Sequence, residues 1–326
     1  MSTLITGGAG FIGSHMAWAM RDAGEPFVII DRLSTGFAAA PPPGASLIRA
    51  DIGDRDALRR AIADHKVDSI IHFAGSIVVP ESVAAPLEYY ENNTSKSRSL
   101  IEAAVEGGVR HFVFSSTAAV YGTPETASVT EDAPLRPESP YGSSKLMTEI
   151  MLRDAARAHG LKYGVLRYFN VAGADPQART GQATKGATHL IKVAVEAALG
   201  KRDHLSIFGT DYSTPDGTCV RDYIHVSDLI EAHLLTLKHL RAGGGNVTLN
   251  CGYGRGFSVR EVIEAVHRVA GKPFRVAEAP RRPGDPATIV ANASRARALL
   301  GWTPRFDDLD RIVADALAWE RSERFG

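Results

Sequence analysis

Short apolar runs and longer amphipathic segments alternate through the first half of the chain. The apolar runs predict strands near 3–6, 27–31, 47–50, 69–73, 111–116 and 162–167. The segments between them have helical periodicity and predict helices near 12–23, 54–64, 86–106 and 143–159. Strands alternating with helices in this way are typical of an α/β fold, in which a parallel sheet is covered by helices on both faces.

The pattern changes after residue 170. Segment 171–220 is rich in Gly, Thr, Asp and Pro around one predicted helix near 188–199. After it we expect helices near 226–241, 258–270 and 308–322 and a strand near 247–251. They predict a second, smaller α/β domain, with a discontinuous boundary. We expect the larger domain to comprise 1–170 plus about 217–245, and the smaller one about 171–216 and 246–326.

Composition narrows the classes of partner. Of the 326 residues, 44% are hydrophobic and 23% charged, with 37 basic and 37 acidic side chains, so no net field favours nucleic acid or a membrane surface. Two cysteines, Cys219 and Cys251, argue against a disulfide framework and for a reducing, cytoplasmic location. We expect no leader and no membrane span, since the first strand begins at residue 3 and no apolar run reaches about 18 residues.

The first predicted strand runs directly into glycines at 7, 10 and 13, and a predicted helix follows. Glycines permit a tight turn and a close approach of phosphates, while the helix N-terminus offers free N–H groups to an anion. The next strand ends at Asp31, where a carboxylate suits the ribose hydroxyls of NAD. These features predict a Rossmann-type, doubly wound domain that binds NAD, although the neighbouring Arg32 weakens the argument against NADP.

Ligands of parallel sheets bind beyond the carboxyl ends of the strands, so residues that follow strands are site candidates. These residues are Gly7, Asp31, Asp51, Phe73-Ala74-Gly75, Ser115-Ser116-Thr117 and Tyr168-Phe169-Asn170.

Tyr141 and Lys145 are four residues apart at the start of the helix predicted near 143–159. This spacing places both side chains on one helix face, where they can flank the same reacting group. A free tyrosine titrates near pH 10, so a tyrosine base at neutral pH needs a positive environment. Lys145 together with a nicotinamide ring would supply it.

These motifs, in this order, resemble those of the extended short-chain dehydrogenase/reductase family. Within that family the chain is similar over nearly its whole length to the UDP-glucose 4-epimerases, and the motifs of the second half are the more specific ones. The segments that carry this likeness are Leu166-Arg167-Tyr168-Phe169-Asn170, Phe208-Gly209-Thr210-Asp211-Tyr212, Val220-Arg221-Asp222-Tyr223 and Arg281-Arg282-Pro283-Gly284-Asp285.

The resemblance implies interconversion of UDP-galactose and UDP-glucose by transient oxidation at sugar C4, with tightly bound NAD. Tyr141 would be the base, Lys145 would hold the nicotinamide ribose and lower the Tyr141 pKa, and Thr117 would bond the same sugar oxygen. The implied cofactor residues are Gly7, Gly10, Phe11, Ile12, Gly13, Asp31, Asp51, Ile52, Phe73, Ala74, Gly75, Asn92, Ser115, Tyr141, Lys145 and Tyr168. The implied substrate residues are Thr117, Tyr141, Asn170, His189, Leu190, Phe208, Arg221, Arg282 and Asp285. The resemblance also implies a homodimer formed through the helices near 86–106 and 143–159.

Several residues allow two interpretations. Asp51 would read the adenine edge or cap the following helix; Asn92 would support the nicotinamide or occupy a turn or helix interior. His189 would contact a substrate phosphate or serve as an ordinary polar side chain. No Cys–His cluster has the spacing of a zinc site, so no metal is expected.

The chain departs from the epimerase pattern at Ile77, where many epimerases have Lys, and in the run 94–99. Ile289, at a position expected to limit bulk at the sugar 2-position, leaves acceptance of N-acetylated sugars, pentoses or uronates open. A nucleotide-sugar 4,6-dehydratase is disfavoured because Ala118 and Ala119 replace its acid–base pair after Thr117. A non-catalytic NAD-binding regulator is disfavoured because the Tyr141/Lys145 pair is present.

Overall fold

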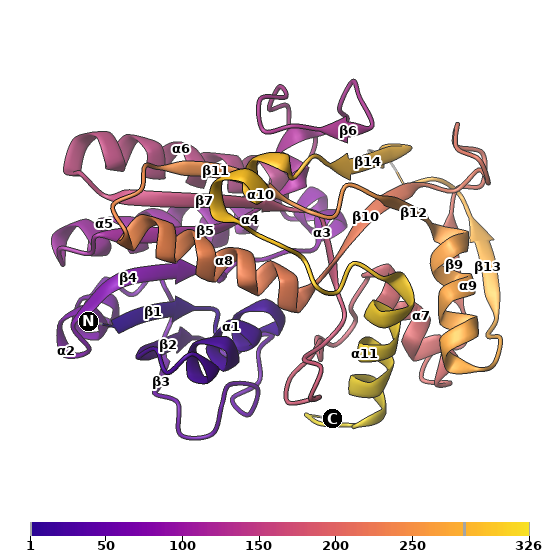
Figure 1. Cartoon of the computed structure of the whole chain (residues 1–326), viewed down its shortest axis with the longest axis horizontal. Helices are drawn as coiled ribbons and strands as arrows, with labels where there is room; N and C mark the ends of the chain where they lie inside the picture. The colour runs from indigo at the N-terminus through magenta and orange to yellow at the C-terminus, as the bar shows by residue number, and fades with distance from the viewer. Residues whose placement is uncertain (1, 283–284, 326) are drawn as a thin grey trace.

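The larger part of the molecule is a parallel sheet, seen in a computed structural model that describes residues 2–282 and 285–325 (Figure 1). Within the described part the sheet has seven strands, and each neighbouring pair is parallel. Their order is β11 (Val247–Cys251), β7 (Lys162–Tyr168), β5 (His111–Thr117), β4 (Val67–His72), β1 (Ser2–Thr6), β2 (Phe27–Asp31) and β3 (Leu47–Arg49). The strands are short and largely apolar because both faces of the sheet are covered.

Helices cover both faces of this sheet. α1 (Phe11–Asp22) and α8 (Val226–Arg241) pack on one face, and α2 (Arg55–Asp64), α5 (Lys96–Glu106) and α6 (Pro140–His159) pack on the other. Met16 and Leu229 belong to the core on the first face, and Leu58 and Leu152 to that on the second. The predicted doubly wound α/β fold is therefore confirmed.

A smaller mixed sheet lies beside the carboxyl ends of the large-sheet strands (Figure 1). It contains β12 (Gly256–Ser258), β10 (Val220–His225), β14 (Thr288–Ala291) and β6 (Ser128–Val129), and β8 (Asn170–Ala172) pairs with β10. A separate pair joins β9 (Leu205–Phe208) and β13 (Val276–Ala279). The accompanying helices are α7 (Leu190–Ala198), α9 (Val259–Ala270) and α11 (Leu309–Arg321), whereas α10 (Ser294–Leu300) contacts α8 and β11 of the larger part.

Two strands lie on the other side of the expected domain boundary. β11 was expected in the smaller domain but forms the edge of the large sheet, where its register pairs Leu249 with Leu166. β10 was expected in the larger domain but lies in the smaller sheet, where Tyr223 pairs with Asn170. Sequence order alone does not say which edge a late strand joins, because pairing depends on the three-dimensional path of the chain. The remaining division stays a prediction.

The helix expected over 86–106 is not uniform. The chain forms α3 (Val79–Ala84), α4 (Pro86–Tyr89), a π-helix (Tyr90–Ser95) and then α5. In the widened π turn, the Asn93 carbonyl accepts hydrogen bonds from the hydroxyls of Ser97 and Thr148, the latter at 3.2 Å. The two hydroxyls thus provide hydrogen-bond donors to a backbone carbonyl of the π turn. Single π turns of this kind are often found at functional sites.

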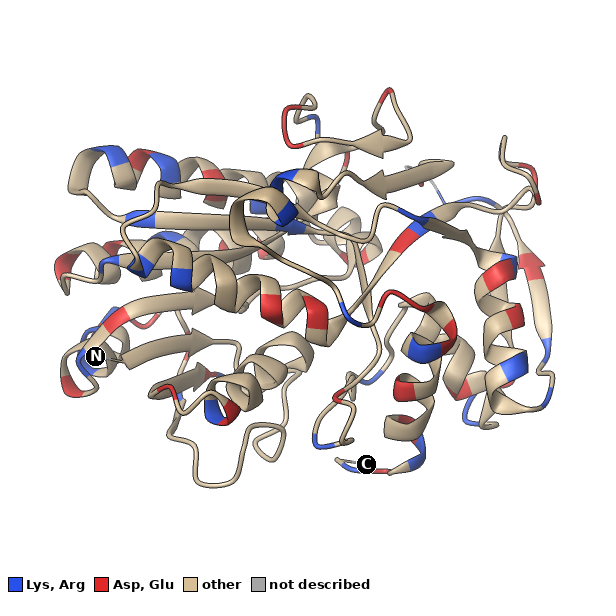
Figure 2. Ribbon diagram, in the orientation of Figure 1, with Lys and Arg blue, Asp and Glu red and all other residues tan. Residues whose placement is uncertain are grey.

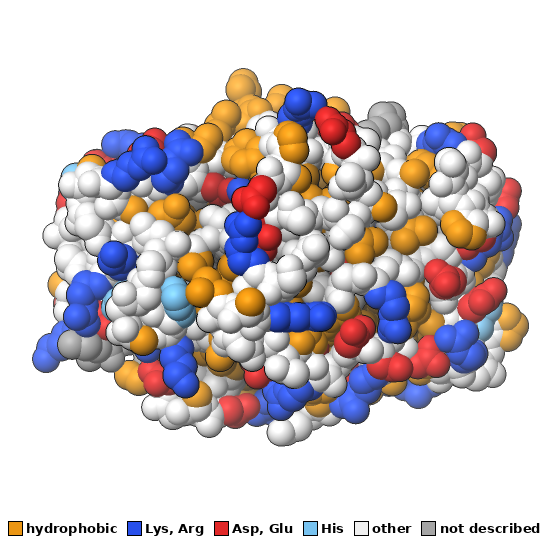
Figure 3. Space-filling view, turned by 45° about the horizontal axis from the view of Figure 1, so that its top comes forward, with side chains coloured by type: hydrophobic (Ala, Val, Ile, Leu, Met, Phe, Trp, Pro, Cys, Tyr) orange, Lys and Arg blue, Asp and Glu red, His pale blue; other side chains and the backbone are white. Residues whose placement is uncertain are grey.

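Charged residues are concentrated on helices and connecting loops, and the strands of the large sheet carry few of them (Figure 2). On the face shown in Figure 3, acidic and basic side chains are interspersed and form no field of one sign. Within residues 2–282 and 285–325, no helix is long and apolar enough to cross a membrane.

Candidate active site

The glycine turn after β1 is shaped by contacts that exclude a side chain. Gly7 has φ of +67°, and a Cβ added there would lie 2.7 Å from the backbone nitrogen of Ala74. A Cβ at Gly13 would lie 2.1 Å from the Gly7 carbonyl oxygen, and Gly10 caps the start of α1 with extended backbone. The turn therefore presents backbone without side chains beside the uncapped N-terminus of α1, which fits a dinucleotide pyrophosphate.

Asp31 lies at the end of β2 with its carboxylate fixed by two backbone amides. One oxygen accepts from Ala9 N at 3.0 Å and the other from Leu33 N at 2.8 Å. Arg32 points elsewhere, because its guanidinium donates to Ser34 and to Asp51 at 3.1 and 3.2 Å. The structure thus brings Asp31 beside the glycine turn, as the cofactor prediction requires, while Arg32 is engaged away from it.

Asp51 follows β3 and is held by two cations. Its Oδ2 accepts from Lys96 Nζ at 2.7 Å and from Arg32, and its Oδ1 accepts from Gly53 N at 2.8 Å. Although partial burial opposes ionisation, these contacts keep the pKa of Asp51 below its usual value. The helix-cap alternative is not what forms: Asp54 caps α2 through the amides of residues 56 and 57. Ile52 is buried in the apolar core next to Asp51.

Tyr141 and Lys145 lie on the buried face of α6, only 6% and 3% exposed. Ser139 starts this helix by accepting from Gly142 N at 3.2 Å, and Pro140 occupies a first-turn position that suits proline. Lys145 Nζ donates to the carbonyl of Ser115 at 3.1 Å, at the end of β5. The structure therefore brings the predicted pair to the carboxyl end of the central strands.

The two side chains have displaced pKa values. Burial, followed by the neighbouring Tyr168, raises the pKa of Tyr141, and a hydrogen bond with Thr117 lowers it. Burial lowers the pKa of Lys145 to about 8, and Glu149 opposes that change. The polypeptide's own groups thus favour the neutral phenol. The predicted lowering of the Tyr141 pKa by Lys145 stays a prediction that depends on the positive charge of a nicotinamide ring.

The turn after β4 places backbone against the ammonium of Lys145. A Cβ added to Gly75 would lie 3.0 Å from Asn93 Oδ1 and 3.7 Å from Lys145 Nζ. Phe73 packs against the His233 ring at 4.9 Å, and Ala74 N lies 3.4 Å from the Thr6 hydroxyl. The segment 73–75 therefore connects the glycine turn to Lys145.

Asn93, which the sequence analysis did not single out, has more contacts here than Asn92. Its amide accepts from Ser76 N at 2.7 Å and donates to the Ser144 hydroxyl at 3.1 Å. Asn92 donates to the Ser76 hydroxyl at 2.8 Å, so it braces the same turn. The sequence shows only that two asparagines, Asn92 and Asn93, stand side by side. The π-helix of the structure shows that Asn93 is the buried one.

Strand pairing connects the surroundings of Tyr141 and Lys145 to the smaller sheet. Thr117 on β5 pairs with Tyr168 on β7, and the Tyr168 side chain hydrogen-bonds with Ser115. The chain then enters β8, where Asn170 pairs with Tyr223. The chain therefore passes from the end of β5, beside Tyr141 and Lys145, to the predicted substrate residue Asn170.

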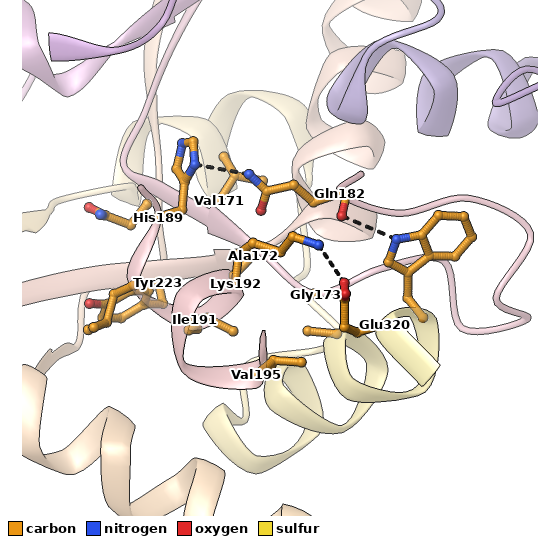
Figure 4. Close-up of a pocket in the computed structure, with 14 residues that line it drawn as sticks. Val171, Ala172, Gly173, Gln182, His189, Ile191, Lys192, Val195, Tyr223 and Glu320 are labelled. Atoms are coloured by element: carbon orange, nitrogen blue, oxygen red, sulfur yellow. Dashed lines mark hydrogen bonds and ion pairs between the residues drawn. The ribbon is translucent and has the colours of Figure 1, made fainter. Parts of the chain in front are cut away.

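A cavity of about 20 Å³ lies between β8, α7 and α11 (Figure 4). Asn170, His189, Leu190 and Tyr223 line it, and the Gln182 amide is 2.9 Å from His189 Nδ1. Burial lowers the pKa of His189, which favours a neutral ring. The sequence did not predict Tyr223 as a site residue. It stands two positions after the predicted substrate residue Arg221.

The remaining predicted substrate residues form two contacts. The Arg282 guanidinium lies over the Phe208 ring at 3.8 Å from its centroid. Arg221 lies 3.6 Å from the Asp285 carboxylate. Pro283 and Gly284 of the same loop lie outside the described residues. Basic, acidic and aromatic groups thus lie in contact around β9, β10 and the loop before β14, which suits a nucleoside diphosphate.

No cluster of three or more His, Cys, Asp or Glu able to hold a metal ion occurs within the described ranges. The two thiols, Cys219 and Cys251, are free.

The comparisons with known proteins agree with this geometry. The family model "NAD dependent epimerase/dehydratase family" matches residues 3–252. The chain belongs to this family. It is 60% identical over 319 residues to the UDP-glucose 4-epimerase of Azospirillum brasilense, covering 98% of this chain and 92% of the relative.

Solved structures of family members superpose along nearly the whole chain. The UDP-glucose 4-epimerase of Brucella ovis in complex with NAD aligns with a TM-score of 0.94 and 42% identity, covering 97% of each chain. The UDP-Glc/GlcNAc 4-epimerase of Campylobacter jejuni aligns with a TM-score of 0.86 and 47% identity, covering 98% of this chain and 99% of the other. The NAD-binding prediction is confirmed at the level of the family.

Proposed function

We propose that this protein is an NAD-dependent UDP-glucose 4-epimerase that interconverts UDP-galactose and UDP-glucose. The observation that carries the proposal is the Tyr141/Lys145 pair, which is buried on one face of α6, with Lys145 bound to the Ser115 carbonyl at the end of β5 and close to the turn at Gly75. The 60% identity to an epimerase over nearly the full length supports the same reaction.

In the proposed reaction the Tyr141 oxygen takes the proton of the sugar 4-hydroxyl and later returns it. Thr117 hydrogen-bonds with Tyr141, so it can also hold that sugar oxygen. Lys145 donates to the Ser115 carbonyl and is buried on α6, one helical turn after Tyr141. When bound, NAD supplies the acceptor and donor of the C4 hydride, and the chain's contribution is position and charge.

The nucleotide part of the substrate is proposed to bind where the cations of the smaller sheet gather. Arg221 and Arg282 suit the diphosphate, because guanidinium groups bond phosphate oxygens in pairs. Phe208 offers a ring for the uracil, Asp285 accepts from the ribose, and Asn170, His189 and Leu190 line the sugar side. A tethered diphosphate would let the keto sugar turn between its two faces without leaving.

Proton NMR of the purified protein with UDP-galactose and no added NAD tests the proposal. Appearance of UDP-glucose is the expected result, and it would also show that the cofactor is retained through purification. If no product forms even after NAD is added to the same tube, the proposed function is wrong for this substrate pair.

A second substrate is favoured by one relative. The Campylobacter jejuni enzyme is named for both glucose and N-acetylglucosamine forms, and it aligns with 98% of this chain. Ile289 is buried on β14 beside Arg221, and it is smaller than an aromatic residue. The same assay with UDP-N-acetylglucosamine distinguishes an enzyme that accepts both sugars from one that accepts only UDP-glucose and UDP-galactose. A rate below about 1% of the rate with UDP-galactose would indicate the second.

We also propose a homodimer formed through α3, α4 and α6, in a cytoplasmic enzyme with reduced thiols. Val83, Leu87, Met147 and Ile150 on these helices are 64%, 79%, 42% and 39% exposed. Apolar side chains gathered on adjacent helices favour an interface. Sedimentation should give about twice the 34.9 kDa chain mass, and Leu87→Glu should shift the protein toward monomer. A wild-type monomer at micromolar concentration would contradict the proposal.

A further inference from the structure

A buried ion pair lies one helical turn beyond Lys145. Glu149 is 7% exposed and Arg167 is 4% exposed. Arg167 Nη2 donates to Glu149 Oε2 at 2.7 Å, and Arg167 Nε lies 3.1 and 3.2 Å from the two carboxylate oxygens. Removing two charges from water costs free energy that the pair regains only with full hydrogen bonding, so its position needs a reason beyond stability.

Glu149 is bound to the strand that carries Thr117. Its carboxylate accepts from the hydroxyl of Ser116, while Lys145 donates to the carbonyl of Ser115. Consecutive residues of β5 are therefore tied to two α6 side chains that are four positions apart. These two contacts fix how far α6 is shifted along β5. They therefore also fix the positions of Tyr141 and Lys145 relative to the end of that strand.

Arg167 extends the same bracing to the neighbouring strands. It pairs in register with Ser116, one residue before the Thr117–Tyr168 pair. Its Nη1 donates to the Tyr121 hydroxyl at 3.0 Å, and that hydroxyl donates to Asn250 Oδ1 at 2.7 Å. The ion pair is thus joined to β5, β7 and β11 at their carboxyl ends.

The groups around Lys145 differ in charge. On α6 these are Tyr141 and Glu149, on β5 the Phe114 ring at 4.9 Å and the Ser115 carbonyl, and on β4 His72. Burial lowers the pKa of His72 to about 3 and raises that of Tyr141, so both are neutral near pH 7. Of these groups, Glu149 alone carries a carboxylate, and that carboxylate is paired with Arg167.

We propose that Glu149, held in place by Arg167, is a positioning residue that keeps Lys145 charged and aligned with Tyr141 in its buried site. This inference rests on the proposed function for its consequence in catalysis. Burial lowers the Lys145 pKa to about 8, and Glu149 is the opposing influence. Without that carboxylate, Lys145 would lose its proton closer to neutral pH, and the charge beside Tyr141 would be lost with it.

The first test measures Lys145 directly. Lysine side chains are labelled at Nζ, the Lys145 signal is assigned with Lys145→Met, and it is titrated by NMR in the protein as purified. Glu149→Gln keeps an acceptor for Ser116 but removes the charge, so the Lys145 pKa should fall by about one unit. An unchanged pKa in this variant would overturn the proposal, whether or not the protein is an epimerase.

Two further variants separate charge from structure. Arg167→Met leaves the carboxylate and should not lower the Lys145 pKa, although it destabilises the fold as Glu149→Gln does. The double variant Glu149→Gln/Arg167→Met leaves no lone buried charge, so it should fold even where a single variant does not, and its Lys145 pKa should fall like that of Glu149→Gln. If both single variants shift the pKa in the same direction, the pair has only a structural role.

The second test is the pH profile of kcat with UDP-galactose. In Glu149→Gln and in the double variant, the alkaline limb should move to lower pH by the same amount as the Lys145 titration. A uniform loss of kcat at every pH, with no movement of the limb, would contradict the proposal. If the wild-type protein converts no UDP-galactose, the proposed function fails, and the NMR titration still decides the effect of Glu149 on Lys145.

Discussion

In the proposed reaction Tyr141 acts as a base from a buried position that favours its neutral form. Burial raises its pKa, and the hydrogen bond with Thr117 is the contact from the chain that lowers it. A buried phenol loses its proton near neutral pH only where a nearby positive charge stabilises the phenolate. In the proposed enzyme, the Lys145 ammonium and the nicotinamide ring of NAD would supply that charge.

Replacing Tyr141 by Phe removes the hydroxyl and retains the ring. We expect kcat to fall by at least about a hundredfold, because a general base contributes about that much. Affinity for UDP should stay within about twofold, since the proposed nucleotide residues belong to the smaller sheet. Steady-state kinetics and calorimetric titration with UDP measure the two effects, and near-full turnover would remove Tyr141 from the mechanism.

The glycine turn is the element in which the backbone, not a side chain, forms the binding surface. Gly13 sits where α1 begins, and an added Cβ would lie 2.1 Å from the Gly7 carbonyl oxygen. That oxygen belongs to the backbone, so it cannot move aside as the end of a side chain could. The turn and the helix therefore need a glycine at this contact.

Gly13→Ala should open the turn and release the cofactor. We expect the purified variant to contain less than about a tenth of the NAD found in the wild type, with the fold retained by circular dichroism. HPLC of the denatured protein measures the NAD content. Gly245→Ala is the control, because nothing lies within 4 Å of a Cβ added there. Equal NAD content in Gly13→Ala and the control would contradict this account of the turn.

Across the whole molecule, buried histidines make the fold sensitive to mild acid. Burial lowers the pKa of His15 and His233 to about 4 and that of His72 to about 3, against a usual value of 6.5. The unfolded chain binds these protons below pH 6.5 and the folded chain does not. The stability they provide is therefore complete above pH 6.5 and is lost as the pH falls toward 4.

The free energy of unfolding should consequently fall by about 2 kcal/mol per buried histidine between pH 7 and pH 5. Urea denaturation at the two values measures the loss. His15→Gln should reduce the difference by about one histidine's share, even if its own stability at pH 7 is lower. A stability that stays constant or rises toward pH 5 would show that these histidines are accessible to protons.

Much of the site was predictable because it follows local rules. A glycine turn needs bare backbone, an acidic residue follows the second strand, and a Tyr and a Lys four apart share a helix face; each is a relation between residues close in sequence. The sequence by itself therefore determined the α/β fold of the first half and the glycine turn for the cofactor, and it placed Tyr141 and Lys145 on one helix face.

Only the tertiary structure decided relations between distant segments. It placed β11 at the edge of the large sheet and β10 in the smaller one, selected Asn93 over Asn92, and brought Arg167 to Glu149. These outcomes depend on which strand edges and helix faces remain free after the first elements have packed. A periodic pattern states which face of an element is buried, but not which other element buries it.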